Sequence, residues 1–176
     1  MRSMFVALSF GAAVLVGSSA VLADSIEVKG PHICCKQCVN VATKILEKID
    51  GVSDIKTDAK SKSVTFTAKD EKSAKAGYKA LIDGGFFGTA TRDGKELSID
   101  IAPLPTGAKA DVIVVKDVHV CCGQCQNGVA KALPDTKISY EGKGPQRTVR
   151  VEGTSLEPAG VLQALRKAGF NGVVQK

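Results

Sequence analysis

The sequence predicts an α+β protein that contains one small βαββαβ unit twice. Three observations support this fold class. A cysteine-rich segment occurs at residues 32–38 and again at 119–125, and the same succession of strand-like and helix-like patterns accompanies each occurrence. The chain has 176 residues, of which 44% are hydrophobic and 24% are charged. This composition excludes a disordered chain and is sufficient for two small hydrophobic cores.

Charge and composition exclude several functional classes. The 24 Lys and Arg residues outnumber the 18 Asp and Glu residues, but they form no basic run, so we expect no nucleic-acid partner. The sequence has no Ser/His/Asp arrangement and no glycine-rich phosphate loop, so we expect no enzyme. The six cysteines, in two clusters of three, are the candidates for chemistry.

Residues 1–23 have the pattern of a secretory signal peptide. Arg2 is followed by an apolar stretch without charge, and Val21-Leu22-Ala23 places small residues at a cleavage site. The uncharged run is just long enough for a retained membrane anchor, but Gly17-Ser18-Ser19-Ala20 interrupts it and favours cleavage. We therefore expect a secreted or periplasmic protein without a retained membrane segment.

The remaining chain divides into two copies and a connection. The repeated segments are His32-Ile33-Cys34-Cys35-Lys36-Gln37-Cys38 and His119-Val120-Cys121-Cys122-Gly123-Gln124-Cys125. A second repeated pair, Gly85-Phe86 and Gly169-Phe170, lies near the end of each copy. We expect a first domain at 24–92, a linker at 93–109 and a second domain at 110–176.

Each copy is predicted to contain strand, helix, strand, strand, helix and strand. In the first copy these elements are expected at 25–29, about 41–49, 52–57, 64–67, 74–82 and 87–91. In the second they are expected at 111–118, a helix ending at Leu133 before Pro134, 137–140, 148–151, 156–168 and 170–174. This order is the ferredoxin-like motif, with a four-stranded antiparallel sheet and two helices on one face.

The linker carries its own signals. Asp93-Gly94 predicts a hairpin turn, and the alternation of Leu97, Ile99 and Ile101 predicts an extra edge strand after the first copy.

The cysteine loops predict soft-metal binding. Two thiols three residues apart at the start of a helix face one point, and the helix dipole favours thiolate there. Thiolates select soft ions such as Cu(I), Hg(II) and Zn(II). The paired thiols in this position are Cys35 with Cys38 and Cys122 with Cys125, and the further candidate ligands are Cys34, Cys121, His32 and His119. Each further candidate also has a structural interpretation, as a small buried cysteine or a packed histidine.

Both copies resemble heavy-metal-associated domains, a family that includes copper chaperones, N-terminal modules of metal-transporting ATPases and the periplasmic mercury-binding protein. The family motif Met-x-Cys-x-x-Cys aligns with the C-x-x-C of each copy. The resemblance implies a ferredoxin-like fold and soft-metal binding, with transfer to a metal transporter or another metal-binding module. It also places Phe86 and Phe170 near the site.

Two departures from the family pattern leave the identity of the ion open. Ile33 and Val120 stand where the family has methionine, and Cys34 and Cys121 occupy its variable position. A three-sulfur site in each copy is one consequence. We expect each copy to hold one ion, or the two copies to share one across the linker, and composition does not decide between them.

Two other functions stay open at this point. C-x-x-C at a helix start also occurs in thiol-disulfide exchange proteins, although no Pro or Trp flanks these pairs. The cysteines could instead form disulfides that stabilise an interaction module, although three cysteines cannot all pair within one copy.

Overall fold

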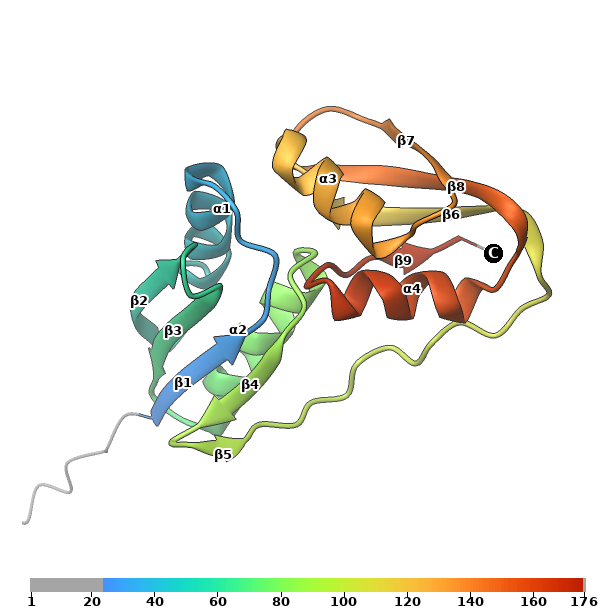
Figure 1. Cartoon of the computed structure of the whole chain (residues 1–176). Coiled ribbons are helices and arrows are strands. Elements are labelled where there is room, and N and C mark those ends of the chain that lie inside the picture. Colours follow the sequence, from blue (N-terminus) through green and yellow to red (C-terminus); the bar gives the residue numbers. More distant parts are fainter. Residues whose placement is uncertain (1–23, 176) are drawn as a thin grey trace, which may run out of the picture.

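The computed structural model describes residues 24–175, so the expected signal peptide at 1–23 lies outside the described residues. The α+β class is confirmed, because the described residues form two antiparallel sheets and four helices. None of these helices is long and apolar enough to cross a membrane. Figure 1 shows each sheet with its own pair of helices, and a long connection that runs from the first sheet to the second.

The first copy contains a five-stranded sheet. In chain order its elements are β1 (Asp24–Lys29), α1 (Lys36–Leu46), β2 (Val52–Asp58), β3 (Ser63–Ala68), α2 (Glu71–Asp83), β4 (Thr89–Arg92) and β5 (Lys95–Glu96). The strand order is β2-β3-β1-β4-β5. Helices α1 and α2 contact each other and the sheet, so both lie on one face of it.

The second copy repeats this arrangement without an extra strand among its described residues. Its elements are β6 (Ala110–His119), α3 (Gly123–Ala132), β7 (Lys137–Glu141), β8 (Gln146–Leu156), α4 (Pro158–Lys167) and β9 (Val173–Val174). The strand order is β7-β8-β6-β9. Helix α4 begins two residues later than the pattern predicts, because Pro158 occupies its first turn, where proline needs no N–H partner.

Helix α1 has the amphipathic pattern that the sequence predicts. Cys38, Ala42 and Leu46 follow each other at four-residue spacing and are all buried. The helix ends at Leu46, before the last apolar residue of the pattern. Ile49 lies in the turn that leads to Gly51, whose positive φ of 78° reverses the chain towards β2.

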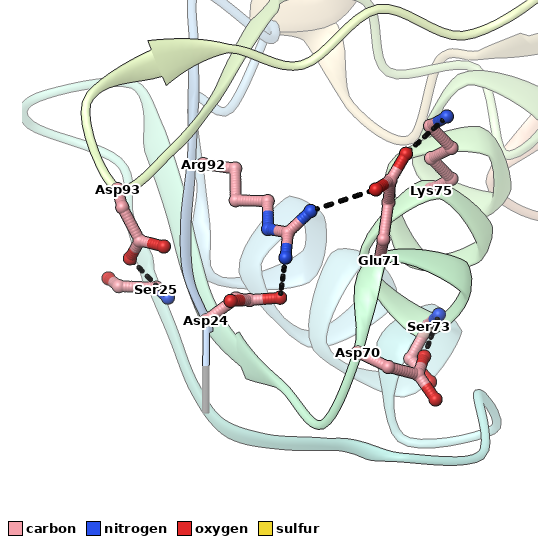
Figure 2. A network of polar contacts seen from close by, with 8 residues as sticks. All are labelled: Asp24, Ser25, Asp70, Glu71, Ser73, Lys75, Arg92 and Asp93. Carbon is pink, nitrogen blue, oxygen red and sulfur yellow. Dashed lines mark hydrogen bonds and ion pairs between the residues drawn. The ribbon is translucent and has the colours of Figure 1, made fainter. Parts of the chain in front are cut away.

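Helix α2 begins at a side-chain cap. The Asp70 carboxylate accepts a hydrogen bond from the Ser73 N–H at 2.7 Å, which satisfies one free donor of the first turn. Glu71, in the same turn, pairs with Arg92 at 3.1 Å, and Arg92 pairs with Asp24 at 2.8 Å. Figure 2 shows how this network joins the starts of β1 and α2 to the end of β4.

The segment after β4 differs in part from its prediction. Asp93 and Gly94 form the expected turn, both with positive φ, and β5 pairs with β4 through Lys95 and Glu96. The expected edge strand at residues 97–101 is absent: the chain there is irregular. Leu97, Ile99 and Ile101 instead pack against the hydrophobic core, so their alternation serves side-chain burial rather than strand pairing.

The two copies are joined by matching segments. Phe86 and Phe170 form an antiparallel bridge, and the N–H of Asn171 donates to the carbonyl of Gly85 at 3.0 Å. The buried side chains of both copies belong to one continuous hydrophobic cluster. The cysteine-rich loops are therefore held against each other by a packed interface.

Arg166 of α4 ties the linker to this interface. Its Nε donates to Asn171 Oδ1 at 2.9 Å, a second nitrogen donates to the Ala102 carbonyl at 3.0 Å, and its guanidinium lies 5.2 Å from the ring centre of Phe87. Burial lowers the pKa of Arg166. The chain between the copies is thus anchored at its midpoint.

Candidate metal centre

The cysteine loops occupy equivalent places in the two copies. Cys35 and Cys122 are the residues before α1 and α3, and both have extended backbone. Neither has a side-chain capping bond, so both thiols are available for other partners. Cys38 and Cys125 lie in the first helical turn and have no exposed surface. The sequence correctly placed a cysteine pair at the start of each helix.

All six thiols form one cluster between the copies. They are free cysteines, and nine pairs of sulfur atoms lie 3.4–3.8 Å apart. Within each C-x-x-C pair, Cys35 Sγ is 3.6 Å from Cys38 Sγ and Cys122 Sγ is 3.8 Å from Cys125 Sγ. Such a concentration of sulfur ligands could hold a soft metal ion.

The extra cysteine of each copy faces the C-x-x-C pair of the other. Cys34 Sγ lies 3.6 Å from Cys122 Sγ and 3.5 Å from Cys125 Sγ. Cys121 Sγ lies 3.6 Å from Cys35 Sγ and 3.4 Å from Cys38 Sγ. The additional sulfur that distinguishes these loops is therefore directed across the interface.

Both histidines border the cluster. His119 is only 1% exposed, and neither of its ring nitrogens has a hydrogen-bond partner. Its ligand nitrogen lies within 4.8 Å of the sulfurs of Cys38, Cys121 and Cys125. His32 is half-buried, and its unpartnered Nε2 is also enclosed. Buried imidazole nitrogens without partners are costly unless a ligand completes them.

Each histidine is positioned by a phenylalanine of the other copy. The His32 ring stacks on Phe170 with centres 4.2 Å apart, and the His119 ring lies against Phe86 at 4.4 Å. The resemblance to heavy-metal-associated domains implied that both phenylalanines lie near the site, but it did not indicate that each would contact the opposite copy. The repeated Gly-Phe pair was the available signal.

Two glycines allow the backbones of the two copies to approach closely at this interface. Gly169 has φ of 87°, and a Cβ there would lie 2.3 Å from the Gly30 carbonyl and 2.5 Å from the His32 nitrogen. Gly85 has φ of 89°, and a Cβ there would lie 2.6 Å from the His119 nitrogen. Only glycine allows both the backbone conformation and the close approach of the two copies.

Hydrogen bonding between sulfurs distributes the protons unequally. The bond to Cys125 lowers the pKa of Cys38, and the same bond is the largest cause of the raised pKa of Cys125. Burial is the main cause of the raised pKa values of Cys34 and Cys121. The opposite pKa shifts of Cys38 and Cys125 therefore arise from one contact at the centre of the cluster.

Burial also affects His32. It is the largest cause of the lowered pKa of that imidazole, which favours the neutral form. Neutral imidazole is the form that binds metal ions.

The structure thus brings together all eight sequence-predicted candidates, namely Cys34, Cys35, Cys38, Cys121, Cys122, Cys125, His32 and His119. The sequence left open whether the copies act separately, and the structure places their sulfurs in one cluster. The chain matches no protein-family model, and no curated protein matches it significantly.

Proposed function

We propose that this chain is an exported protein that binds soft metal ions at a centre shared by its two copies, and that it sequesters the ions or passes them to a partner. The observation that carries the proposal is the convergence of six free thiols from two loops, with sulfur–sulfur distances of 3.4–3.8 Å. Clustered thiolates select soft ions such as Cu(I), Hg(II) or Zn(II), and this spacing is close to the sulfur–sulfur edge of a tetrahedral site.

The order of elements supports the proposal that each copy is ferredoxin-like and similar to heavy-metal-associated domains. The strand orders β2-β3-β1-β4 and β7-β8-β6-β9 are those of a split βαβ unit, and the C-x-x-C loops follow the first strand of each copy. A partner with a similar loop, such as a metal transporter or another metal-binding module, would exchange the ion through incoming thiolates.

The partly exposed sulfurs give ligand exchange a physical route. Cys35 and Cys122 are half-buried, whereas Cys38 and Cys125 are fully buried. A partner's thiolate can therefore approach the cluster on the side of Cys35 and Cys122 while the buried sulfurs still hold the ion. This chemistry transfers an ion and needs no catalytic turnover.

Metal analysis of the reduced chain, purified without oxygen, tests the proposal. We expect tight binding of Cu(I), Hg(II) or Zn(II) with protection of thiols, and loss of binding in a variant with all six cysteines replaced by serine. The proposal fails if the thiol-intact chain binds every soft ion offered only at micromolar concentrations or more weakly. Oxidation of the same cysteines without metal binding would favour thiol-disulfide exchange or structural disulfides.

A further inference from the structure

Two of the six sulfurs lie at the centre of the cluster. Cys38 Sγ and Cys125 Sγ are 3.8 Å apart, and both side chains are fully buried. Cys121 Sγ lies 3.4 Å from Cys38 Sγ and 3.8 Å from Cys125 Sγ. Cys34 Sγ lies 3.7 Å from Cys38 Sγ and 3.5 Å from Cys125 Sγ. Two triangles of sulfur therefore share the Cys38–Cys125 edge.

A histidine stands beside each triangle. The ligand atoms of His119, Cys38, Cys121 and Cys125 all lie within 4.8 Å of one another. On the other side, the ligand atoms of His32, Cys34 and Cys125 also lie within 4.8 Å of one another.

The chain directs each His-x-Cys pair to one side. Ile33 and Val120, the residues between histidine and cysteine, are buried in the hydrophobic core. The ligand atoms of His32 and Cys34 lie within 4.8 Å of each other, and so do those of His119 and Cys121.

We propose that the centre holds two soft divalent cations bridged by the thiolates of Cys38 and Cys125. Cys121 and His119 complete the coordination of one ion, and Cys34 and His32 complete that of the other. This inference rests on the proposed function, because it specifies how many ions the shared site takes and of which class.

The sulfur spacing fits this assignment. A tetrahedral site with metal–sulfur bonds of about 2.3 Å has sulfur–sulfur edges of about 3.8 Å. The five edges of the two triangles measure 3.4, 3.5, 3.7, 3.8 and 3.8 Å. Two tetrahedra that share one edge therefore fit the four sulfurs. The His119 nitrogen lies within 4.8 Å of all three sulfurs of its triangle, whereas the His32 nitrogen is grouped with Cys34 and Cys125 and must approach Cys38 to complete the second tetrahedron.

Charge favours divalent ions. Two divalent cations and four thiolates carry no net charge, and the two imidazoles are neutral ligands. Because Cys38, Cys125 and His119 are buried, a neutral centre avoids the large cost of an uncompensated charge in the interior. Two monovalent ions with the same ligands would leave two negative charges there.

Cys35 and Cys122 take no part in this bridged pair. Both are half-buried, and their sulfurs form with that of Cys34 a third group whose atoms lie within 4.8 Å of one another. They are suited to capture an ion from solution and pass it inward. In the loaded protein they stay free to react.

Cadmium NMR of the whole chain tests the inference, with Cd(II) in its NMR-active isotope as the soft divalent probe. We expect two bound Cd(II) ions per chain by native mass spectrometry, and two resonances coupled to each other through the shared thiolates. A single ion, or two uncoupled resonances, would overturn the bridged assignment and leave the proposed function standing. Absence of tight binding by any soft ion would remove both.

Alkylation of the Cd(II)-loaded chain gives a second readout. We expect rapid reaction at Cys35 and Cys122 and protection of Cys34, Cys38, Cys121 and Cys125. Rapid reaction at Cys38 or Cys125 would contradict the assignment, even if two ions are bound.

Matched serine variants separate bridging from outer thiols. Cys35→Ser combined with Cys122→Ser should keep both ions and their coupling. Cys38→Ser should lose the coupling and bind at most one ion tightly. If the outer pair of substitutions abolishes binding instead, the ions lie in separate C-x-x-C sites. The wild-type spectrum decides the question even if Cys38→Ser fails to fold.

Discussion

The two copies share the histidines, cysteines and Gly-Phe pairs through which they touch, but their histidines differ in how deeply they are buried. The identical residues of the repeat include the histidines, the cysteines and the Gly-Phe pairs, and these make the contacts between the copies. Each phenylalanine supports the histidine of the other copy rather than its own. Internal repetition in this chain therefore marks an interface, which a single copy cannot form.

The contact is not fully symmetric. His119 is 1% exposed with both nitrogens unpartnered, whereas His32 is half-buried with one enclosed unpartnered nitrogen. His32 packs close to Gly128 of α3, where a Cβ would lie 2.6 Å from its ring. The equivalent residue of the first copy is Val41. The two halves of the centre thus have similar candidate ligands, but the two histidines differ in burial and in the residues packed around them.

The largest expected effect comes from removing an aromatic ring at the interface. Phe170→Ala should cost about 3–5 kcal/mol of unfolding free energy, because the ring is fully buried. It should also weaken metal binding, because His32 loses the surface on which it stacks. Chemical denaturation and Cd(II) titration measure the two effects.

Phe66→Ala is the matched control for this prediction. Phe66 is also buried, but it lies in β3 within the first copy and packs near Gly77 of α2. We expect a similar loss of stability with little change in metal affinity for the fraction that folds. Equal losses of affinity in the two variants would show that the interface contact has no specific role.

A smaller loss of unfolding free energy is expected from adding a methyl group at Gly169, where the backbones of the two copies approach closely. Gly169→Ala places a Cβ against the backbone of Gly30 and His32, which cannot move without separating the copies. Gly94→Ala has a similar φ of 79°, but nothing lies within 4 Å of its Cβ. The control should lose about 1 kcal/mol from backbone strain alone, and Gly169→Ala about 1–3 kcal/mol more. If both variants lose the same amount of unfolding free energy, the close approach of the two copies at Gly169 does not contribute to stability.

Local signals predicted much of the fold. The helical spacing of Ala42 and Leu46 predicted part of the buried face of α1, and Asp93-Gly94 predicted the turn before β5. Both signals depend on residues close in sequence. The alternation of Leu97, Ile99 and Ile101 gave a wrong prediction of a strand. Every second side chain of a segment can be buried without hydrogen bonds to a neighbouring strand.

The composition of the candidate site was predicted, but its assembly was not. Every candidate ligand came from the repeat itself. The crossing of Cys34 towards Cys122, and of Phe170 towards His32, depends on how two folded units pack. The local sequence pattern of either copy does not specify that packing, so the shared centre could be recognised only from the structure.

The smallest expected effect concerns the response of the two second helices to acid. Hydrogen bonding to Ser73 is the largest cause of the lowered pKa of Asp70, and hydrogen bonding to Lys75 is the largest cause for Glu71. Helix α4 begins at Pro158, and the residue before it, Glu157, makes no side-chain capping bond but pairs with Lys109 at 3.1 Å. Of these two helices, α2 is therefore the one whose first turn is capped by a carboxylate (Figure 2).

The sign of the effect follows from the lowered pKa values. Carboxylates that hold protons less tightly in the folded state stabilise it above their unfolded pKa, about 4, and lose that contribution as pH falls through the folded value. Amide hydrogen exchange, corrected for its intrinsic pH dependence, should show α2 losing protection before α4 below about pH 4.

Asp70→Asn sharpens this last comparison. Asparagine caps helices about as well as aspartate, but it does not titrate. The variant should keep α2 protected at neutral pH and reduce its sensitivity to acid, so that α2 follows α4 more closely. If α2 of the variant still opens first and over the same pH range, the ionised cap is not the cause. The difference between the copies would then lie in the packing of α2 against the sheet.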